Sequence, residues 1–115
     1  MKIHQYFVYI LTNYGKTVYY TGVTNNLDQR LADHYFNRGN TNTFTGRYGC
    51  FYLLHYEIFK YILKAIEREK EIKGWSRLKK VWLIKQSNPD LQFLNYRFLD
   101  WPPGEFWGRE KAVPE

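Results

Sequence analysis

The chain has 115 residues, of which 44% are hydrophobic and 24% are charged, the balance of a single folded globular domain. This balance excludes a collagen-like chain and a chain that is disordered throughout. Cys50 is the single cysteine, so no disulfide forms within the chain, and we expect a cytoplasmic domain stabilised by packing. No stretch approaches the roughly 20 apolar residues of a membrane helix, and the first residues lack the apolar core of a signal peptide.

The chain is basic and rich in aromatic residues. Lys and Arg number 17 against 11 Asp and Glu, a formal net charge of +6, and aromatic residues make up 20% of the chain. This combination suits a polyanion whose phosphates pair with cations and whose bases stack on aromatic rings. A basic solvated surface over an aromatic core has the same composition, so nucleic acid is one of two interpretations at this point.

The first part of the chain predicts a β-hairpin and a helix. Tyr6 to Leu11 is apolar at both alternating positions, which is typical of a central strand buried on both faces. Asn13 to Lys16 has the composition of a turn, and Val18 to Val23 is the predicted returning strand. Asn25 or Asn26 then caps a helix from Leu27 to Phe36.

The rest of the chain predicts a loop, a third strand and two helices. Residues 37 to 49 are rich in Asn, Thr and Gly and predict a polar, basic loop. Phe51 to Phe59 is the predicted third strand, and a helix from Tyr61 to Lys73 ends at Gly74. Ser76 caps a last helix that runs to Ser87. The order β-β-α-β-α-α predicts a small α+β domain with a three-stranded antiparallel sheet flanked by helices.

We expect this domain to occupy residues 1–90. Residues 91–115 are expected to form an irregular tail that packs on the domain or trails from it. The aromatic residues Trp101, Phe106 and Trp107 would anchor the tail on the core, or would engage a protein partner.

Glu69 is the most informative single residue. At 100° per residue, Ile62, Ala65, Ile66 and Ile72 form an apolar stripe on the predicted helix, and Glu69 falls in its middle. A carboxylate on a buried face is costly unless it is paired or binds a metal ion. The pattern leaves two interpretations open: an interior salt bridge or a functional carboxylate.

Two further pairs are candidates for a site. Folding back around Gly15 places Tyr9 opposite residue 20 or 21, so Tyr9 and Tyr20 are predicted neighbours, either as simple sheet packing or as groups that act on a water. Arg30 and His34 lie four residues apart on one helix. They form either a solvated face or a phosphate contact with a proton-transfer group.

At these residues the chain resembles the GIY-YIG nuclease family, specifically its small single-domain bacterial members. Phe7-Val8-Tyr9 and Tyr20-Thr21-Gly22 stand at the two triplets, with Phe7 in place of the first glycine and Thr21 in place of isoleucine. Arg30 follows Gly22 by eight residues, as the arginine of the family does, and the segment from Glu69 to Arg77 resembles its glutamate helix and the following turn. Several separated motifs in order carry the resemblance over residues 5 to 90.

The resemblance implies a mechanism and a set of site residues. Glu69 would be the single protein ligand of Mg²⁺ or Mn²⁺, Tyr9 would activate or orient the attacking water, and Tyr20 would shape the site. Arg30 would neutralise charge on the phosphoryl oxygens, and His34 would support proton transfer or contact phosphate. Further nucleic-acid contacts are expected from the residues Arg38, Arg47, Lys73, Arg77 and Asn88, of which Asn88 is the candidate for the asparagine of the family.

The expected activity is therefore a metal-dependent endonuclease that hydrolyses DNA phosphodiester bonds. Structured or branched DNA is a candidate substrate, and RNA stays an open alternative. The competing hypothesis is a nucleic-acid-binding module of the same fold with little or no turnover.

Overall fold

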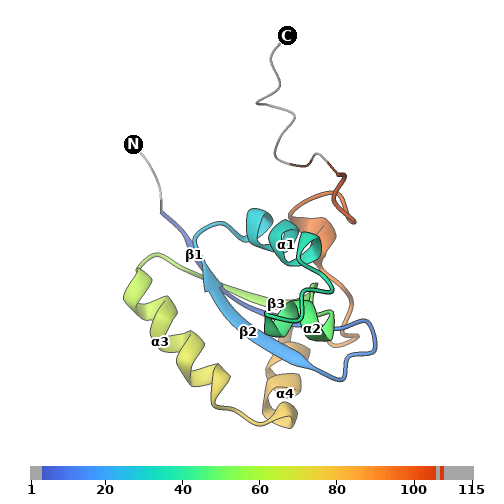
Figure 1. The fold of residues 1–115 in the computed structure, drawn as a ribbon. Coiled ribbons are helices and arrows are strands. Elements are labelled where there is room, and N and C mark those ends of the chain that lie inside the picture. The colour runs from blue at the N-terminus through green and yellow to red at the C-terminus, as the bar shows by residue number, and fades with distance from the viewer. Residues whose placement is uncertain (1–3, 106, 108–115) are drawn as a thin grey trace.

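The structure is a computed structural model that describes residues 4–105 and residue 107. Three antiparallel strands, β1 (Tyr6–Thr12), β2 (Tyr19–Thr24) and β3 (Tyr52–Phe59), form one sheet in the order β2-β1-β3. The helices are α1 (Leu27–Phe36), α2 (Phe44–Tyr48), α3 (Ile62–Lys73) and α4 (Arg77–Ser87), followed by a short 3-10 helix at Asn95–Arg97 (Figure 1). The predicted α+β class, with a three-stranded antiparallel sheet flanked by helices, is confirmed.

Strand β1 is the central strand, as its apolar pattern predicts, and it divides the core into two halves. Tyr9 and Leu11 face one half, which they share with Leu27 and Leu31 of α1. The alternate residues of β1 face the other half, which contains residues of α3 and α4. Figure 1 shows α1 on one side of the sheet and α3 and α4 on the other. Because successive side chains of a strand point to opposite faces, both halves of the core depend on this one strand.

The pairing of the hairpin strands differs from the prediction, which placed residue 20 or 21 opposite Tyr9. Tyr9 pairs with Gly22, and Leu11 pairs with Tyr20, rather than Tyr9 with residue 20 or 21. The reason lies in the loop, where the Asn13 carboxamide oxygen accepts hydrogen bonds from the backbone amides of Thr17 and Val18. The loop therefore extends to residue 18, and the first strand pair is between residues 12 and 19.

The segment 37–49 contains a helix where the sequence predicted only a polar loop. Helix α2 begins after Thr43, whose hydroxyl accepts a hydrogen bond from the Gly46 amide, and it ends at Gly49, which adopts a left-handed conformation with a φ of 68°. Gly46 is packed so closely that an added Cβ would lie 2.4 Å from the Asn40 carbonyl oxygen. The helix was missed because it spans little more than one turn and carries no apolar periodicity.

The residues after α4 complete the first half of the core. Leu94 and Leu99 are buried there, and Trp101 and Trp107 pack against it. The Asn95 side chain is buried, accepts a hydrogen bond from the Leu53 amide at 2.8 Å, and donates one to the Phe51 carbonyl at 2.9 Å. This amide continues the hydrogen bonding of the β3 segment, so these residues are part of the fold. Residues 106 and 108–115 of the predicted tail, including Phe106, lie outside the described residues.

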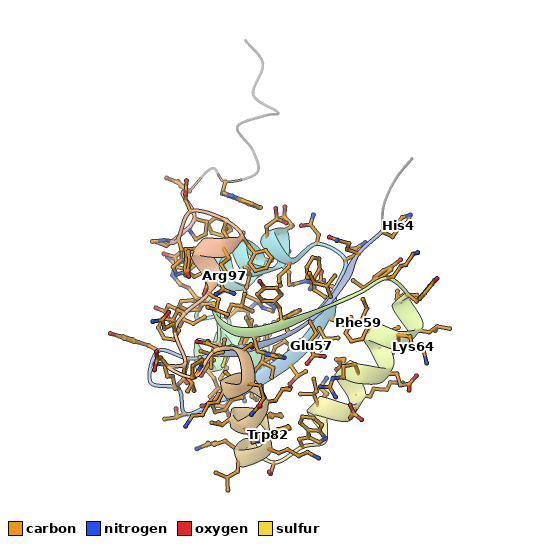
Figure 2. All side chains as sticks on the ribbon, turned by 180° about the vertical axis from the view of Figure 1, so that it is seen from behind. His4, Glu57, Phe59, Lys64, Trp82 and Arg97 are labelled. Atoms are coloured by element: carbon orange, nitrogen blue, oxygen red, sulfur yellow. The ribbon has the colours of Figure 1, made fainter. Side chains whose placement is uncertain are left out.

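A polar cluster around Glu57 joins β3 to α3 on the face of the sheet that α3 covers; Figure 2 labels Glu57. Its carboxylate accepts hydrogen bonds from His55 Nε2 and Arg68 Nε, both at 2.8 Å. Burial raises the pKa of Glu57, but the hydrogen bonds from His55 and Arg68 outweigh that effect and lower the pKa to about 2. The cluster therefore holds an ionised carboxylate between strand and helix at any ordinary pH.

Among the residues that the structure describes, no helix combines the length and the apolar character required to span a bilayer.

Candidate active site

Tyr9 is held at the centre of the candidate site by the strand pairing. It lies opposite Gly22, and only 2% of its surface is exposed. A Cβ added to Gly22 would lie 2.5 Å from both Cζ and the hydroxyl oxygen of Tyr9. The phenol of Tyr9 therefore occupies the space that any other residue at position 22 would need, which explains glycine inside a strand.

Tyr20 is a neighbour of Tyr9, as the sequence predicted, although the two are not paired directly. Their ring centroids are 6.3 Å apart, and Tyr20 lies diagonally across from Tyr9 on the same face of the hairpin. Burial, followed by the nearby Tyr20 hydroxyl, raises the pKa of Tyr9 well above its ordinary value. Tyr9 is consequently a neutral phenol at physiological pH.

Helix α1 brings His34 onto Tyr9. The helix begins at Leu27 because the Asn26 side chain caps it, accepting a hydrogen bond from the Gln29 amide. Two turns later, His34 Nε2 lies 3.1 Å from the Tyr9 hydroxyl. Burial and the nearby Arg30 guanidinium lower the pKa of His34 to about 4, so its imidazole is neutral at physiological pH.

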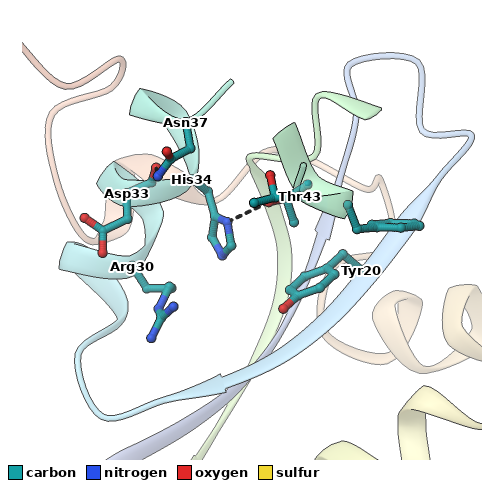
Figure 3. Close-up of a pocket in the computed structure, with 8 residues that line it drawn as sticks. Tyr20, Arg30, Asp33, His34, Asn37 and Thr43 are labelled. Carbon is teal, nitrogen blue, oxygen red and sulfur yellow. Dashed lines mark hydrogen bonds between the residues drawn. The ribbon is translucent and has the colours of Figure 1, made fainter. Parts of the chain in front are cut away.

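A pocket of about 370 Å³ opens beside these groups (Figure 3). Its wall includes Tyr20, Arg30 and His34, while Tyr9, which contacts His34, is not one of the lining residues. Figure 3 shows Arg30 and His34 on the same side of α1, across from Tyr20 of β2. Phe44 of α2 completes the wall, its ring stacked on that of Tyr20 at 6.0 Å. An exposed arginine, a neutral imidazole and a tyrosine therefore share one opening.

Glu69 is buried on α3, as the apolar stripe predicted. It is 9% exposed and lies between the buried residues Ala65 and Ile72, whereas Ile62 at the start of the stripe is 48% exposed. Its carboxylate forms an ion pair with Lys73, one turn along the helix, at 3.2 Å. Helix α3 packs on β1 and β2, and the charge of Glu69 is one of the influences that raise the pKa of Tyr9.

The donor set around Glu69 fits one kind of metal ion. In the described part of the chain, no cluster of three or more His, Cys, Asp or Glu side chains could enclose an ion. A single protein carboxylate suits Mg²⁺ or Mn²⁺, because Mg²⁺ in particular keeps several waters and takes its remaining ligands from a substrate phosphate. The same donor set does not suit Zn²⁺, which is usually held by three or four protein ligands.

The other predicted contact residues lie apart from the pocket lining. Arg38 stacks on the Tyr35 ring at 3.9 Å, and Arg47 donates a hydrogen bond to the Thr41 carbonyl. Lys73 is paired with Glu69, and Arg77 donates a hydrogen bond to the Thr17 carbonyl. All four cationic groups lie on the surface, held by contacts within their own chain.

Asn88 differs from the cationic candidates because its side chain is buried. Its amide nitrogen donates to the carbonyls of Leu54 and Gln92 at 3.0 and 2.9 Å, and its oxygen accepts from the Gln92 amide. Both ends of the amide are thus engaged inside the protein, and we place Asn88 with the fold rather than with the contact surface.

Sequence reasoning missed several residues that line the pocket, among them Phe44 and Thr45, which both belong to α2. The Thr45 hydroxyl lies 3.1 Å from His34 Nδ1, the bond drawn dashed in Figure 3. A local signal existed in the spacing of a capping Thr43 and a terminal Gly49, which marks one helical turn. The contact with His34 itself joins α2 to α1 in space and leaves no pattern in the sequence.

Comparison with known proteins shows the family to which the chain belongs. The family model described as the GIY-YIG catalytic domain matches residues 5–81, which include both triplets, Arg30, His34 and Glu69. The chain belongs to the GIY-YIG family. Domains of this family are of the endonuclease type, and they act on nucleic acid.

Within the family, the chain is similar to UPF0213 proteins. Such a protein of Syntrophus aciditrophicus is 37% identical over 92 residues, covering 73% of this chain and 93% of the relative. A UPF0213 protein of Natronomonas pharaonis is 37% identical over 79 residues, covering 69% and 89%. The solution structure of a UPF0213 protein from Bacillus halodurans is 30% identical, with a TM-score of 0.48 over 75% of this chain and 88% of that chain.

Proposed function

We propose that this protein is a divalent-metal-dependent endonuclease that hydrolyses phosphodiester bonds of DNA. The observation that carries the proposal is the 3.1 Å hydrogen bond between Tyr9 and His34, beside a pocket that Arg30 also lines. A tyrosine hydrogen-bonded to a neutral imidazole, and a surface arginine at the pocket beside that imidazole, are groups that phosphodiester hydrolysis can use.

Tyr9 and His34 form the path for the proton of the attacking water. In this mechanism the Tyr9 proton is directed at His34 Nε2, which lies 3.1 Å from the Tyr9 oxygen. The Tyr9 oxygen is then left to orient the water by accepting its hydrogen bond. As the water oxygen attacks phosphorus, its proton passes to the Tyr9 oxygen, and the Tyr9 proton passes to Nε2. His34 can take this proton because its ring is neutral before the reaction.

Arg30 and Tyr20 act on the substrate itself. The Arg30 guanidinium lies at the pocket and neutralises charge on the phosphoryl oxygens as the transition state forms. Tyr20 lies across the pocket from Arg30 and confines the phosphate between strand β2 and helix α1 (Figure 3). The surface cations Arg38, Arg47, Lys73 and Arg77 would contact phosphates farther along the strand.

Glu69 would hold the metal ion, Mg²⁺ or Mn²⁺. When bound, the ion supplies Lewis-acid stabilisation of negative charge on the phosphate and the leaving oxygen. Its burial keeps the Glu69 carboxylate in place, since the surrounding residues of α3 pack against the sheet.

A nicking assay on supercoiled and branched DNA with Mg²⁺ or Mn²⁺ tests the proposal. Two matched pairs of variants separate the site from general effects: Glu69→Gln against Glu67→Gln, which changes an exposed carboxylate on the same helix, and Tyr9→Phe against Tyr14→Phe, which changes an exposed tyrosine. We expect Glu69→Gln and Tyr9→Phe each to lose about 100-fold or more in rate while both controls stay active.

Two results would contradict the proposal. Metal-dependent cutting that is equally fast in Glu69→Gln would remove this carboxylate from the reaction. A folded wild-type protein that binds DNA in a salt-sensitive way and does not cut it would instead support the binding-module hypothesis.

A further inference from the structure

The site contains a third member that the mechanism above does not use. Thr45 is 5% exposed, and its hydroxyl contacts His34 Nδ1 at 3.1 Å, while His34 Nε2 contacts Tyr9 at 3.1 Å. Tyr9, His34 and Thr45 are therefore linked by two hydrogen bonds, one at each ring nitrogen of His34.

Which group donates in each of these two hydrogen bonds follows from the protonation states of Tyr9 and His34. The imidazole of His34 is neutral, so one ring nitrogen donates and the other accepts. Tyr9 keeps its proton, and a buried O–H needs an acceptor; within the described residues the Tyr9 hydroxyl is hydrogen-bonded to His34 Nε2 alone. Nε2 is therefore the acceptor, and Nδ1 carries the proton and donates to the Thr45 hydroxyl.

We propose that Thr45 is a positioning residue, which fixes His34 in the Nδ1-protonated tautomer so that Nε2 is free to take the proton of Tyr9. The catalytic consequence rests on the proposed function, but the tautomer can be measured without any reaction. The opposite tautomer would direct an N–H at Tyr9 and leave no lone pair to receive its proton.

The backbone around Thr45 is built to hold the hydroxyl in place. Thr43 caps the turn, and an added Cβ at Gly46 would lie within 3 Å of the Asn37 and Asn40 carbonyl oxygens. The Thr45 carbonyl also accepts a hydrogen bond from the Cys50 amide at 2.9 Å. With neighbours on both sides fixed, the backbone of Thr45 is held beside His34, and the hydrogen bond to Nδ1 sets the direction of its hydroxyl.

The ¹⁵N chemical shifts of the histidine rings test the tautomer, because they distinguish a protonated ring nitrogen from a bare one. His55 supplies an internal reference: its Nε2 lies 2.8 Å from the Glu57 carboxylate, which only accepts, so the proton is on Nε2. The His34→Gln variant assigns the His34 signals. Thr45→Val removes the hydroxyl at nearly constant volume, and Thr45→Ser keeps it.

We expect wild type and Thr45→Ser to show protonated Nδ1 in His34, and Thr45→Val to show a mixture of tautomers. In the nicking assay, Thr45→Val should lower kcat about 10-fold with little change in KM, and Thr45→Ser should restore most of the rate. A wild-type His34 protonated at Nε2, or an unchanged tautomer in Thr45→Val, overturns the inference. Absence of cleavage with the expected shifts would refute the proposed function and leave the tautomer assignment standing.

Discussion

Gly22 offers the sharpest test of how the strand pairing builds the site. Replacement by alanine adds one methyl group, which would lie 2.5 Å from Cζ and the hydroxyl oxygen of Tyr9 and 3.0 Å from Cε2 of Tyr20. Ordinary contacts between such atoms are about 3.5 Å, so the Tyr9 ring has to move by about 1 Å. The ring cannot move freely, because Tyr9 is buried and paired to both neighbouring strands.

Two effects of different size follow from this shift. Overpacking of this kind destabilises a protein by about 1–3 kcal/mol, so the fold should survive. The hydrogen bond to His34, now 3.1 Å, would lengthen beyond bonding distance. A misplacement of about 1 Å at a reacting group costs about 100-fold in rate, so Gly22→Ala should lose far more activity than stability.

The assay combines urea unfolding with the nicking reaction, and the hairpin supplies its own control. Gly15→Ala changes the glycine of the adjoining loop, where an added Cβ meets only the Thr17 methyl group at 3.9 Å. We expect that variant to match wild type in both measurements. A Gly22→Ala protein with wild-type stability and rate would refute the argument that the Tyr9 ring occupies this space.

Two further predictions concern stability. Both the His34 and the Glu57 pKa values lie below their ordinary values of 6.5 and 4.5, at about 4 and about 2, so the unfolded chain binds protons first as the pH falls. Stability should therefore decline from about pH 6.5 to 4 through His34, and from about 4.5 to 2 through Glu57, by on the order of 2 kcal/mol each. Urea midpoints across this range check it, since His34→Gln should remove only the upper step and Glu57→Gln only the lower. Asn95→Ala should destabilise the protein by about 2–4 kcal/mol because it leaves the buried Leu53 amide and the partly buried Phe51 carbonyl unpaired, whereas the exposed Asn25→Ala should change thermal unfolding little. Equal melting temperatures for the two asparagine variants would show that Asn95 does not join the C-terminal segment to the fold.

Sequence patterns predicted correctly those features of the fold that depend on residues close together in the sequence. Helix α1 has the predicted bounds, since a capping asparagine and an apolar stripe fix its start and its buried side. The central place of β1 followed from apolar residues on both of its faces. The burial of Glu69 followed from the same kind of periodicity, because the face of a helix is set by residues three and four positions away.

Sequence patterns did not predict the features in which a polar side chain, rather than another backbone group, makes the hydrogen bonds of the backbone. The hairpin register was misplaced because the Asn13 carboxamide holds the loop open for two more residues, and turn composition does not reveal that. Asn95 was assigned to an irregular tail for a related reason. A buried asparagine that satisfies a strand looks, in sequence, like an ordinary loop residue.

The hydrogen-bond chain from Tyr9 to Thr45 shows why a motif alone does not define this site. The motif supplies Tyr9 on a strand and His34 on a helix, and their 3.1 Å contact is a consequence of how α1 crosses the sheet. The tautomer that makes this contact useful depends on Thr45, which lies in a segment of Asn, Thr and Gly with no sequence pattern that marks the contact. Because a neutral imidazole can be protonated at either nitrogen, the residue behind it decides whether a tyrosine in front has an acceptor. On this reasoning, α2 contributes to proton transfer through its fold, since Gly46 and Gly49 give it the shape that presents Thr45 to His34.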